Sequence, residues 1–197
     1  MSSLKWKVTV YNAIVCSKVF YGLETVQMTS ALESKLDAFQ QKGLRRILHI
    51  PPTFIDIFID RSWTNVRVRE KASDILQYES TNPKINTCIR PLSELLTERR
   101  HRLLGHAIRC ERNDPMFQAT FKDETLERFP AFYRRAGAPR QQWLESNMST
   151  AWARIANRPA EDYEGSIEQV RNIKEAAILC KTLFDPSKAE FRRHSSN

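Results

Sequence analysis

Arginines at helical spacing are the residues of this sequence best suited to chemistry, and the chemistry they suit is anion binding. Between residues 94 and 112 the chain reads ELLTERRHRLLGHAIRCER. Wound as a helix, this segment separates its leucines from a basic face. That face holds Arg102, Gly105, Arg109 and Arg112. We expect Gly105 to let a phosphate come close to the backbone, although a solvated cationic face on a core helix would have the same pattern.

A second basic face is expected on a helix over residues 30–49. The apolar stripe of this helix is expected to consist of Leu32, Leu36, Phe39, Gly43 and Ile47. On one flank of the stripe lie the cations Lys35, Lys42, Arg45 and Arg46. Glu33 and Asp37 lie on the other flank, so the helix is polarised in charge, as a helix beside a phosphate backbone would be. A solvated flank explains this pattern equally well, and we interpret Gly43 as a point of close helix approach.

A third basic segment is the turn at residues 133–140, YRRAGAPR. Its arginines are Arg134, Arg135 and Arg140, and the Gly and Pro between them favour a rigid turn. Tyr133 is available there for stacking on a base. The whole chain has a net charge of +8 and a pI near 9.5, which predict attraction to polyanions and an affinity that falls as salt rises.

Catalytic motifs are absent from the sequence. It contains no Gly-rich phosphate loop, no Gly-x-Ser-x-Gly and no His-Glu-x-x-His, so no active site can be assembled and no cofactor is expected. His106 and Cys110, on the expected core side of their helix, are half of a zinc site that Cys88 or His101 would have to complete. We interpret His106 instead as a core histidine with a satisfied hydrogen bond, and we expect no metal.

Composition favours an all-α fold, an irregular bundle of about six helices with little or no sheet. The 197 residues include 5 glycines and 9 prolines, and several long amphipathic runs outnumber alternating strand patterns. No apolar run reaches the roughly 18 residues of a membrane span. The 4 cysteines are widely scattered, which favours a reducing compartment. We therefore expect an intracellular protein, nuclear or cytoplasmic, that does not bind a membrane.

The expected helices divide the chain into three regions. The helices cover residues 2–21, 30–49, 64–78, 92–112, 141–157 and 166–184. The first is apolar most of the way round and is expected to be central, with Gly22 at its end, and the second is expected to open with a capping box of Ser30 and Glu33. The regions are 1–79, a polar linker followed by the basic C-terminal helices over 80–184, and a disordered tail over 185–197.

Several motifs occur in an order that resembles a known family. They are YGLE at 21–24, DAFQQKGLRRIL at 37–48, TN at 64–65, RRHRLLGHAIR at 99–109 and GAPRQQW at 137–143. Over residues 5 to 155 or so, the chain resembles the C-terminal, thumb and post-thumb part of reverse transcriptases encoded by non-LTR (LINE-type) retrotransposons. Ala138 stands where that family usually has Arg, which removes one cation from the turn.

The resemblance implies a thumb-like helical region, 1–79, that holds a template-primer duplex through its backbone. No Tyr-x-Asp-Asp occurs, so no catalytic residue of the RNA-directed DNA polymerase can be carried over. We expect a retroelement-derived fragment without the palm, inactive by itself, that binds RNA or DNA backbones non-specifically. Its expected partners are an RNA template, a DNA/RNA duplex or a palm-containing polymerase chain. The alternative is a helical protein-interaction module without nucleic-acid binding.

Overall fold

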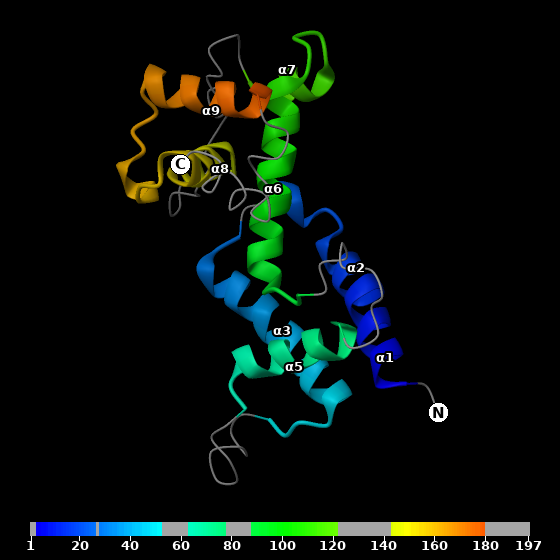
Figure 1. Cartoon of the computed structure of the whole chain (residues 1–197). Coiled ribbons are helices and arrows are strands. Elements are labelled where there is room, and N and C mark those ends of the chain that lie inside the picture. The colour runs from blue at the N-terminus through cyan, green and yellow to red at the C-terminus, as the bar shows by residue number, and fades with distance from the viewer. Residues whose placement is uncertain (1–2, 27, 53–62, 78–87, 122–142, 180–197) are drawn as a thin grey trace, which may run out of the picture. The chain divides into compact units, whose positions relative to one another are not determined.

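The described part of the chain is entirely helical. The structure is a computed structural model that describes residues 3–26, 28–52, 63–77, 88–121 and 143–179 (Figure 1), and these ranges contain no strand. The α-helices are α1 (Leu4–Val10), α2 (Ser17–Phe20), α3 (Ser30–Leu48), α5 (Asn65–Gln77), α6 (Leu92–Arg109), α7 (Pro115–Thr120), α8 (Trp143–Ala156) and α9 (Ile167–Leu179). A π-helix, Tyr11–Cys16, joins α1 to α2, and two short 3-10 helices cover Leu23–Thr25 and Ala160–Asp162. The prediction of an all-α fold is confirmed.

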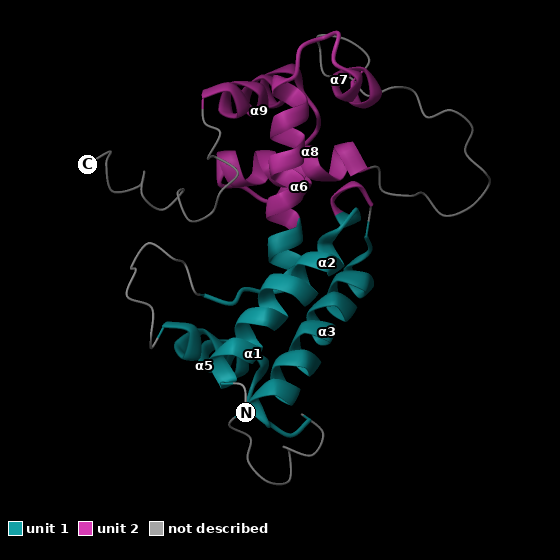
Figure 2. Cartoon of the chain, turned by 90° about the vertical axis from the view of Figure 1, so that its right-hand side faces the viewer, with its two compact units in different colours: residues 1–23, 28–96 teal, residues 24–27, 97–197 magenta. Residues whose placement is uncertain are grey.

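The chain forms two compact units, which Figure 2 colours separately. Unit 1 comprises residues 1–23 and 28–96, and unit 2 comprises residues 24–27 and 97–197. Helix α6 begins in unit 1 and ends in unit 2. The boundary predicted at residues 79 and 80 and the predicted tail at 185–197 lie outside the described residues, so both stay predictions.

In unit 1, helices α1, α3 and α5 pack against one another, and the first turn of α6 completes the unit (Figure 2). One buried cluster consists of Val8, Leu44, Leu48, Ile50, Val68, Ala72 and Ile89. The other consists of Cys16, Phe20, Leu36, Leu92 and Leu96. Helix α5 lies within the range predicted for it, 64–78. Thr64 Oγ1 accepts a hydrogen bond from the Arg67 backbone N–H at its start, and Val68 and Ala72 are buried.

The N-terminal helical segment lies at the surface of unit 1, so the expectation that it is central is wrong. Only Val8, Cys16 and Phe20 are buried along it, whereas Trp6 is 57% exposed and Ile14 is 50% exposed. The segment does end before Gly22, as predicted, and Gly22 has a φ of +76°, in the left-handed region that favours glycine.

Helix α3 packs on Tyr11 at Gly43, as the close-approach interpretation requires. A Cβ added at Gly43 would overlap the Tyr11 hydroxyl and ring. The hydroxyl donates to the carbonyls of Phe39 and Gln40, each at 3.3 Å. Burial, with the Cys16 thiol as a second cause, raises the pKa of Tyr11 to about 12, so the hydroxyl stays protonated and donates.

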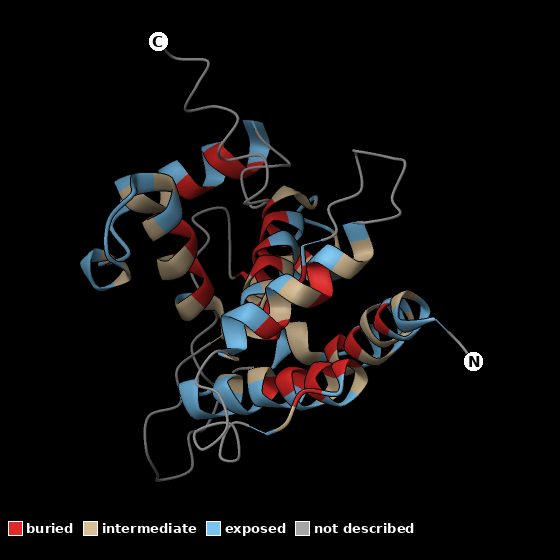
Figure 3. Cartoon of the chain, turned by 60° about the horizontal axis from the view of Figure 1, so that its bottom comes forward, coloured by how far each residue is buried: buried red, intermediate tan, exposed pale blue. Residues whose placement is uncertain are grey.

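The buried face of α3 differs from its predicted stripe. The buried positions are Leu36, Gln40, Gln41, Leu44, Arg45 and Leu48, and Figure 3 shows how buried and exposed positions alternate along the helices. Leu32 and Phe39, expected inside, are 45% and 43% exposed. The cap also lies one residue earlier than predicted, because the Thr29 Oγ1 accepts from the Leu32 backbone N–H.

Unit 2 is built around α8, α9 and the second part of α6. Its core consists of Leu104, Ala107, Ile108, Phe117, Phe121, Met148, Ala151, Trp152, Ile173 and Ala177. Residues 24–26 belong to this unit because three side chains hold them: the Trp143 indole donates to the Glu24 carbonyl at 2.5 Å, Arg100 donates to the Val26 carbonyl at 2.6 Å, and Arg99 pairs with the Glu24 carboxylate at 3.0 Å. Ile167, the first residue of α9, is 81% exposed.

Candidate nucleic-acid interface

The exposed side of α3 gathers three of the predicted site residues. Lys35, Lys42 and Arg46 are all exposed. At about 100° per residue they fall within roughly 40° of one another around the helix, and the first and the last lie about 16 Å apart along its axis. The three cations therefore form one line along a single rigid element, which we call the α3 basic face.

The carboxylates of α3 lie away from this face. Glu33 and Asp37 are half-buried on the opposite side of the helix. Asp37 accepts hydrogen bonds from the Ser93 backbone N–H at 2.9 Å and the Ser93 hydroxyl at 2.6 Å, at the start of α6, where a helix terminus favours a negative charge. Among the described residues, no carboxylate forms an ion pair with the three cations of the α3 basic face.

Arg45 is a correction to the predicted site, because it is buried instead of facing solvent. Only 6% of the residue is exposed. Its guanidinium donates to the Pro51 carbonyl at 2.7 Å and to the Trp63 carbonyl at 2.5 Å, and it also reaches Asn65 Oδ1 at 3.5 Å. Arg45 therefore fastens the chain after α3 to the start of α5, and no phosphate can take those donors.

Gly105 is a second correction. It is buried in α6, so the expectation that it opens an arginine face to a phosphate is wrong. Its spacing from Arg102 and Arg109 predicted an exposed position for Gly105, and Glu98 lies on the same side of the helix. Both are buried in the structure, together with Arg100 and His101.

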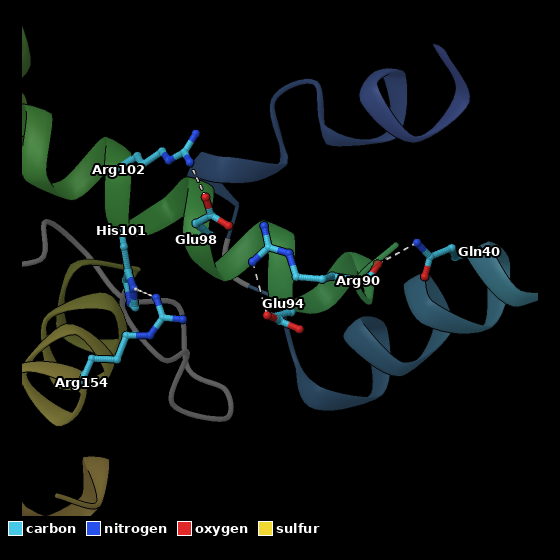
Figure 4. A network of polar contacts seen from close by, with 7 residues as sticks. All are labelled: Gln40, Arg90, Glu94, Glu98, His101, Arg102 and Arg154. Atoms are coloured by element: carbon cyan, nitrogen blue, oxygen red, sulfur yellow. Dashed lines mark hydrogen bonds and ion pairs between the residues drawn. The ribbon is translucent and has the colours of Figure 1, made fainter. Parts of the chain in front are cut away.

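The remaining α6 cations are only partly available. Arg102 is exposed but pairs with the buried carboxylate of Glu98 one turn earlier (Figure 4). Arg109 is half-buried and donates from Nη1 to the Ala177 carbonyl at 3.1 Å, near the end of α9, where carbonyls lack helical partners. Arg112 lies beyond the helix and is exposed.

His101 is the buried histidine of α6, whereas His106 is exposed, so the interpretation of His106 as the core histidine is wrong. Burial, with Arg154 and Arg100 as further causes, lowers the pKa of His101 to about 3, so the ring is neutral. Arg154 can only donate, so Nδ1 accepts at 3.2 Å (Figure 4). Nε2 therefore carries the proton and donates it toward the Thr150 hydroxyl at 2.9 Å. The network fixes α8 against α6.

The described residues contain no group of three or more side chains suited to a metal ion. The predicted half-site brings Cys110 Sγ within 3.9 Å of His106 Nε2, but no third ligand joins them in the described ranges. The basic turn with Arg134, Arg135 and Arg140 lies outside the described residues, so its role stays a prediction.

The sequence alone missed the apolar part of the α3 basic face. Phe39 and Leu32 lie beside the cations, although the pattern placed them in the core. The sequence did contain a signal for the true inward face of α3. Leu36 and Leu44 are eight residues apart and Leu44 and Leu48 are four apart, so the three leucines lie on one side of the helix, and Phe39 does not lie on that side.

Comparisons with protein-family models, with curated proteins and with solved structures find no match for this chain. None of the described helices is both long enough and apolar enough to cross a bilayer.

Proposed function

We propose that this protein binds the sugar-phosphate backbone of nucleic acid without sequence specificity, through the α3 basic face. The observation that carries the proposal is the line of Lys35, Lys42 and Arg46, exposed on one helix face with the carboxylates of that helix turned away. Point charges at helical spacing can each meet a phosphate but carry no information about bases. The net charge of +8 adds long-range attraction to any such polymer.

The test is a titration of labelled duplex DNA and duplex RNA at rising salt, with wild type and the Lys42→Glu/Arg46→Glu double variant. Wild type should bind with a steep negative slope of log affinity against log salt. The variant should bind weakly, with a slope shallower by about 0.9 on B-DNA for each phosphate that the protein no longer neutralises. Absence of binding by wild type at low salt would refute the proposal.

The matched control is Arg171→Glu/Lys174→Glu, which changes the net charge equally on exposed positions of α9. This variant should keep a slope close to that of wild type. If both variants lose affinity equally, total charge is responsible and α3 is not a specific face. Circular dichroism of each variant shows whether its helices remain intact.

The resemblance supports a more specific form of the proposal, a retroelement-derived reverse transcriptase fragment of thumb and post-thumb character. In that form the natural ligand is an RNA template or a DNA/RNA duplex, and a palm-containing polymerase chain is the second partner. The chain alone should extend no primer, and any nucleotide incorporation in a primer-extension assay would overturn this assignment.

A second candidate function, a helical protein-interaction module, is supported by the exposed residues of the N-terminal segment. Trp6, Ile14 and Tyr21 are 57%, 50% and 92% exposed. Scattered apolar residues at a surface are ordinary, so this support is weaker than that of the aligned cations. The salt titration separates the two functions.

A further inference from the structure

Phe39 on the α3 basic face has no role in gripping a duplex. It is 43% exposed, although a phenyl ring has no polar atom that gains from contact with water. Around the helix it lies about 20° from Arg46 and about 40° from Lys35, and along the axis it is about 4.5 Å from Lys42. An exposed aromatic ring therefore lies beside the line of cations, between Lys35 and Lys42 along the helix axis.

The ring also stands on a fixed backbone. The Tyr11 hydroxyl donates to the carbonyls of Phe39 and Gln40, and Gly43, one turn later, lies directly against Tyr11. Leu32, 45% exposed, adds apolar surface two turns earlier on the same side. The face thus combines an aromatic platform, held by the packing of the N-terminal segment, with charges before and after it.

Duplex and single-stranded nucleic acids differ in what they can offer to such a platform. A duplex stacks its bases internally and presents phosphates, so Phe39 would gain little from it. A single strand presents phosphates together with the flat faces of its bases, and a base can stack on an aromatic side chain whatever its identity. The cations suit the backbone of either ligand, but only the second ligand also offers a partner to the ring.

We propose that the α3 basic face binds single-stranded nucleic acid, with one base stacked on Phe39 and the backbone held by Lys35, Lys42 and Arg46. This inference rests on the proposed function, since the same cations supply the backbone contacts. It goes further by naming the strand state of the ligand and the residue that recognises it.

The experiment measures the affinity of wild type and Phe39→Ala for three labelled probes of equal length at one low salt concentration. The probes are oligothymidylate, a DNA duplex and an abasic single strand that has the backbone without bases. Loss of one stacked base should weaken oligothymidylate binding by about 5- to 150-fold. Binding of the duplex and of the abasic strand should not change, because neither offers a base to Phe39.

Two further variants serve as controls for folding and for position. Phe39→Trp keeps an aromatic platform and should retain the affinity for oligothymidylate, which separates stacking from a folding defect. Trp6→Ala removes another exposed aromatic residue of unit 1 and should leave all three affinities as they are. If Trp6→Ala weakens oligothymidylate binding as much as Phe39→Ala does, the assignment to Phe39 is overturned.

The outcomes distinguish this inference from the proposed function. If duplex and single strand bind equally well and Phe39→Ala changes neither affinity, the stacking inference fails while backbone binding stands. If wild type binds none of the probes at low salt, the stacking inference and the proposed function both fail. An acidic protein surface is then the remaining candidate partner of the face.

Discussion

The basic residues of α3 and those of α6 have similar spacing in the sequence but differ in burial and in their contacts in the structure. On α3, Lys35, Lys42 and Arg46 stay on the exposed side, and only Arg45 turns inward. On α6, Arg100 is buried and Arg109 donates to a backbone carbonyl, so these arginines serve the packing of unit 2. Helical spacing groups cations on a face, but it does not say whether that face meets solvent or carbonyl oxygens.

The largest effect expected from a single substitution contrasts two neighbours on α3, Arg45 and Arg46. Arg45→Ala should lower the free energy of unfolding by about 3 kcal/mol, because the buried carbonyls of Pro51 and Trp63 lose charged donors. Arg46→Ala should change it by less than about 0.5 kcal/mol, since the residue is exposed. Urea unfolding measures both, and equal losses would remove the distinction between interior and surface arginines.

For binding, the larger effect of this pair should come from Arg46 and not from Arg45. Arg46→Ala should weaken nucleic-acid affinity and reduce its salt slope, while Arg45→Ala, measured where it remains folded, should bind as wild type does. Arg45→Met, which keeps most of the side-chain volume, separates lost packing from lost hydrogen bonds. A binding defect in folded Arg45→Met would return Arg45 to the candidate site.

The second prediction concerns the interior of unit 2 and its dependence on pH. His101 has a pKa of about 3 in the folded state against an ordinary value of 6.5, so the unfolded chain takes up a proton first as pH falls. The histidine is neutral in both states above pH 6.5, and this contribution is then zero. Below that pH the folded state should lose about 1.4 kcal/mol for each pH unit until the folded pKa is reached.

Unfolding by urea at several pH values between about 7 and 4 gives this slope directly. His101→Gln removes the titrating group and should flatten the slope, with some loss of stability at neutral pH. If His101→Gln loses stability with falling pH as steeply as wild type does, other titrating groups cause that loss. NMR of the folded protein at neutral pH should also show His101 as the tautomer that is protonated on Nε2.

Helical class and most helix bounds were predictable because they depend on local periodicity. The inward face of α3 was not, since Gln40 and Arg45 are polar by type yet buried, with partners at Arg90 and Pro51 that only the folded chain brings near. The core histidine was assigned to His106 instead of His101 for the same reason: Thr150 and Arg154 satisfy the His101 ring from α8. Exposed Lys42 and Arg46 were predictable because they depend on no distant partner.

A third prediction tests the packing of α3 on Tyr11, which holds the α3 basic face in place. Gly43→Ala should destabilise unit 1 by about 1 to 3 kcal/mol, because the new methyl group would overlap Tyr11. In a Tyr11→Ala background the overlap disappears, and the same change should become stabilising through helix propensity, by up to about 1 kcal/mol. The double-mutant cycle measures this coupling, and simple additivity would mean that Tyr11 moves aside without cost.

The smallest effect is expected at Arg109, where the contrast between the two helices is easiest to break. Arg109→Ala removes one hydrogen bond to the Ala177 carbonyl and should cost about 1 kcal/mol of stability. Nucleic-acid affinity should fall less than in Arg46→Ala, because the guanidinium already has a partner inside unit 2. A larger loss of affinity than in Arg46→Ala, with unchanged stability, would show that Arg109 leaves Ala177 for a phosphate. The α6 cations would then belong to the interface, as their spacing in the sequence predicts.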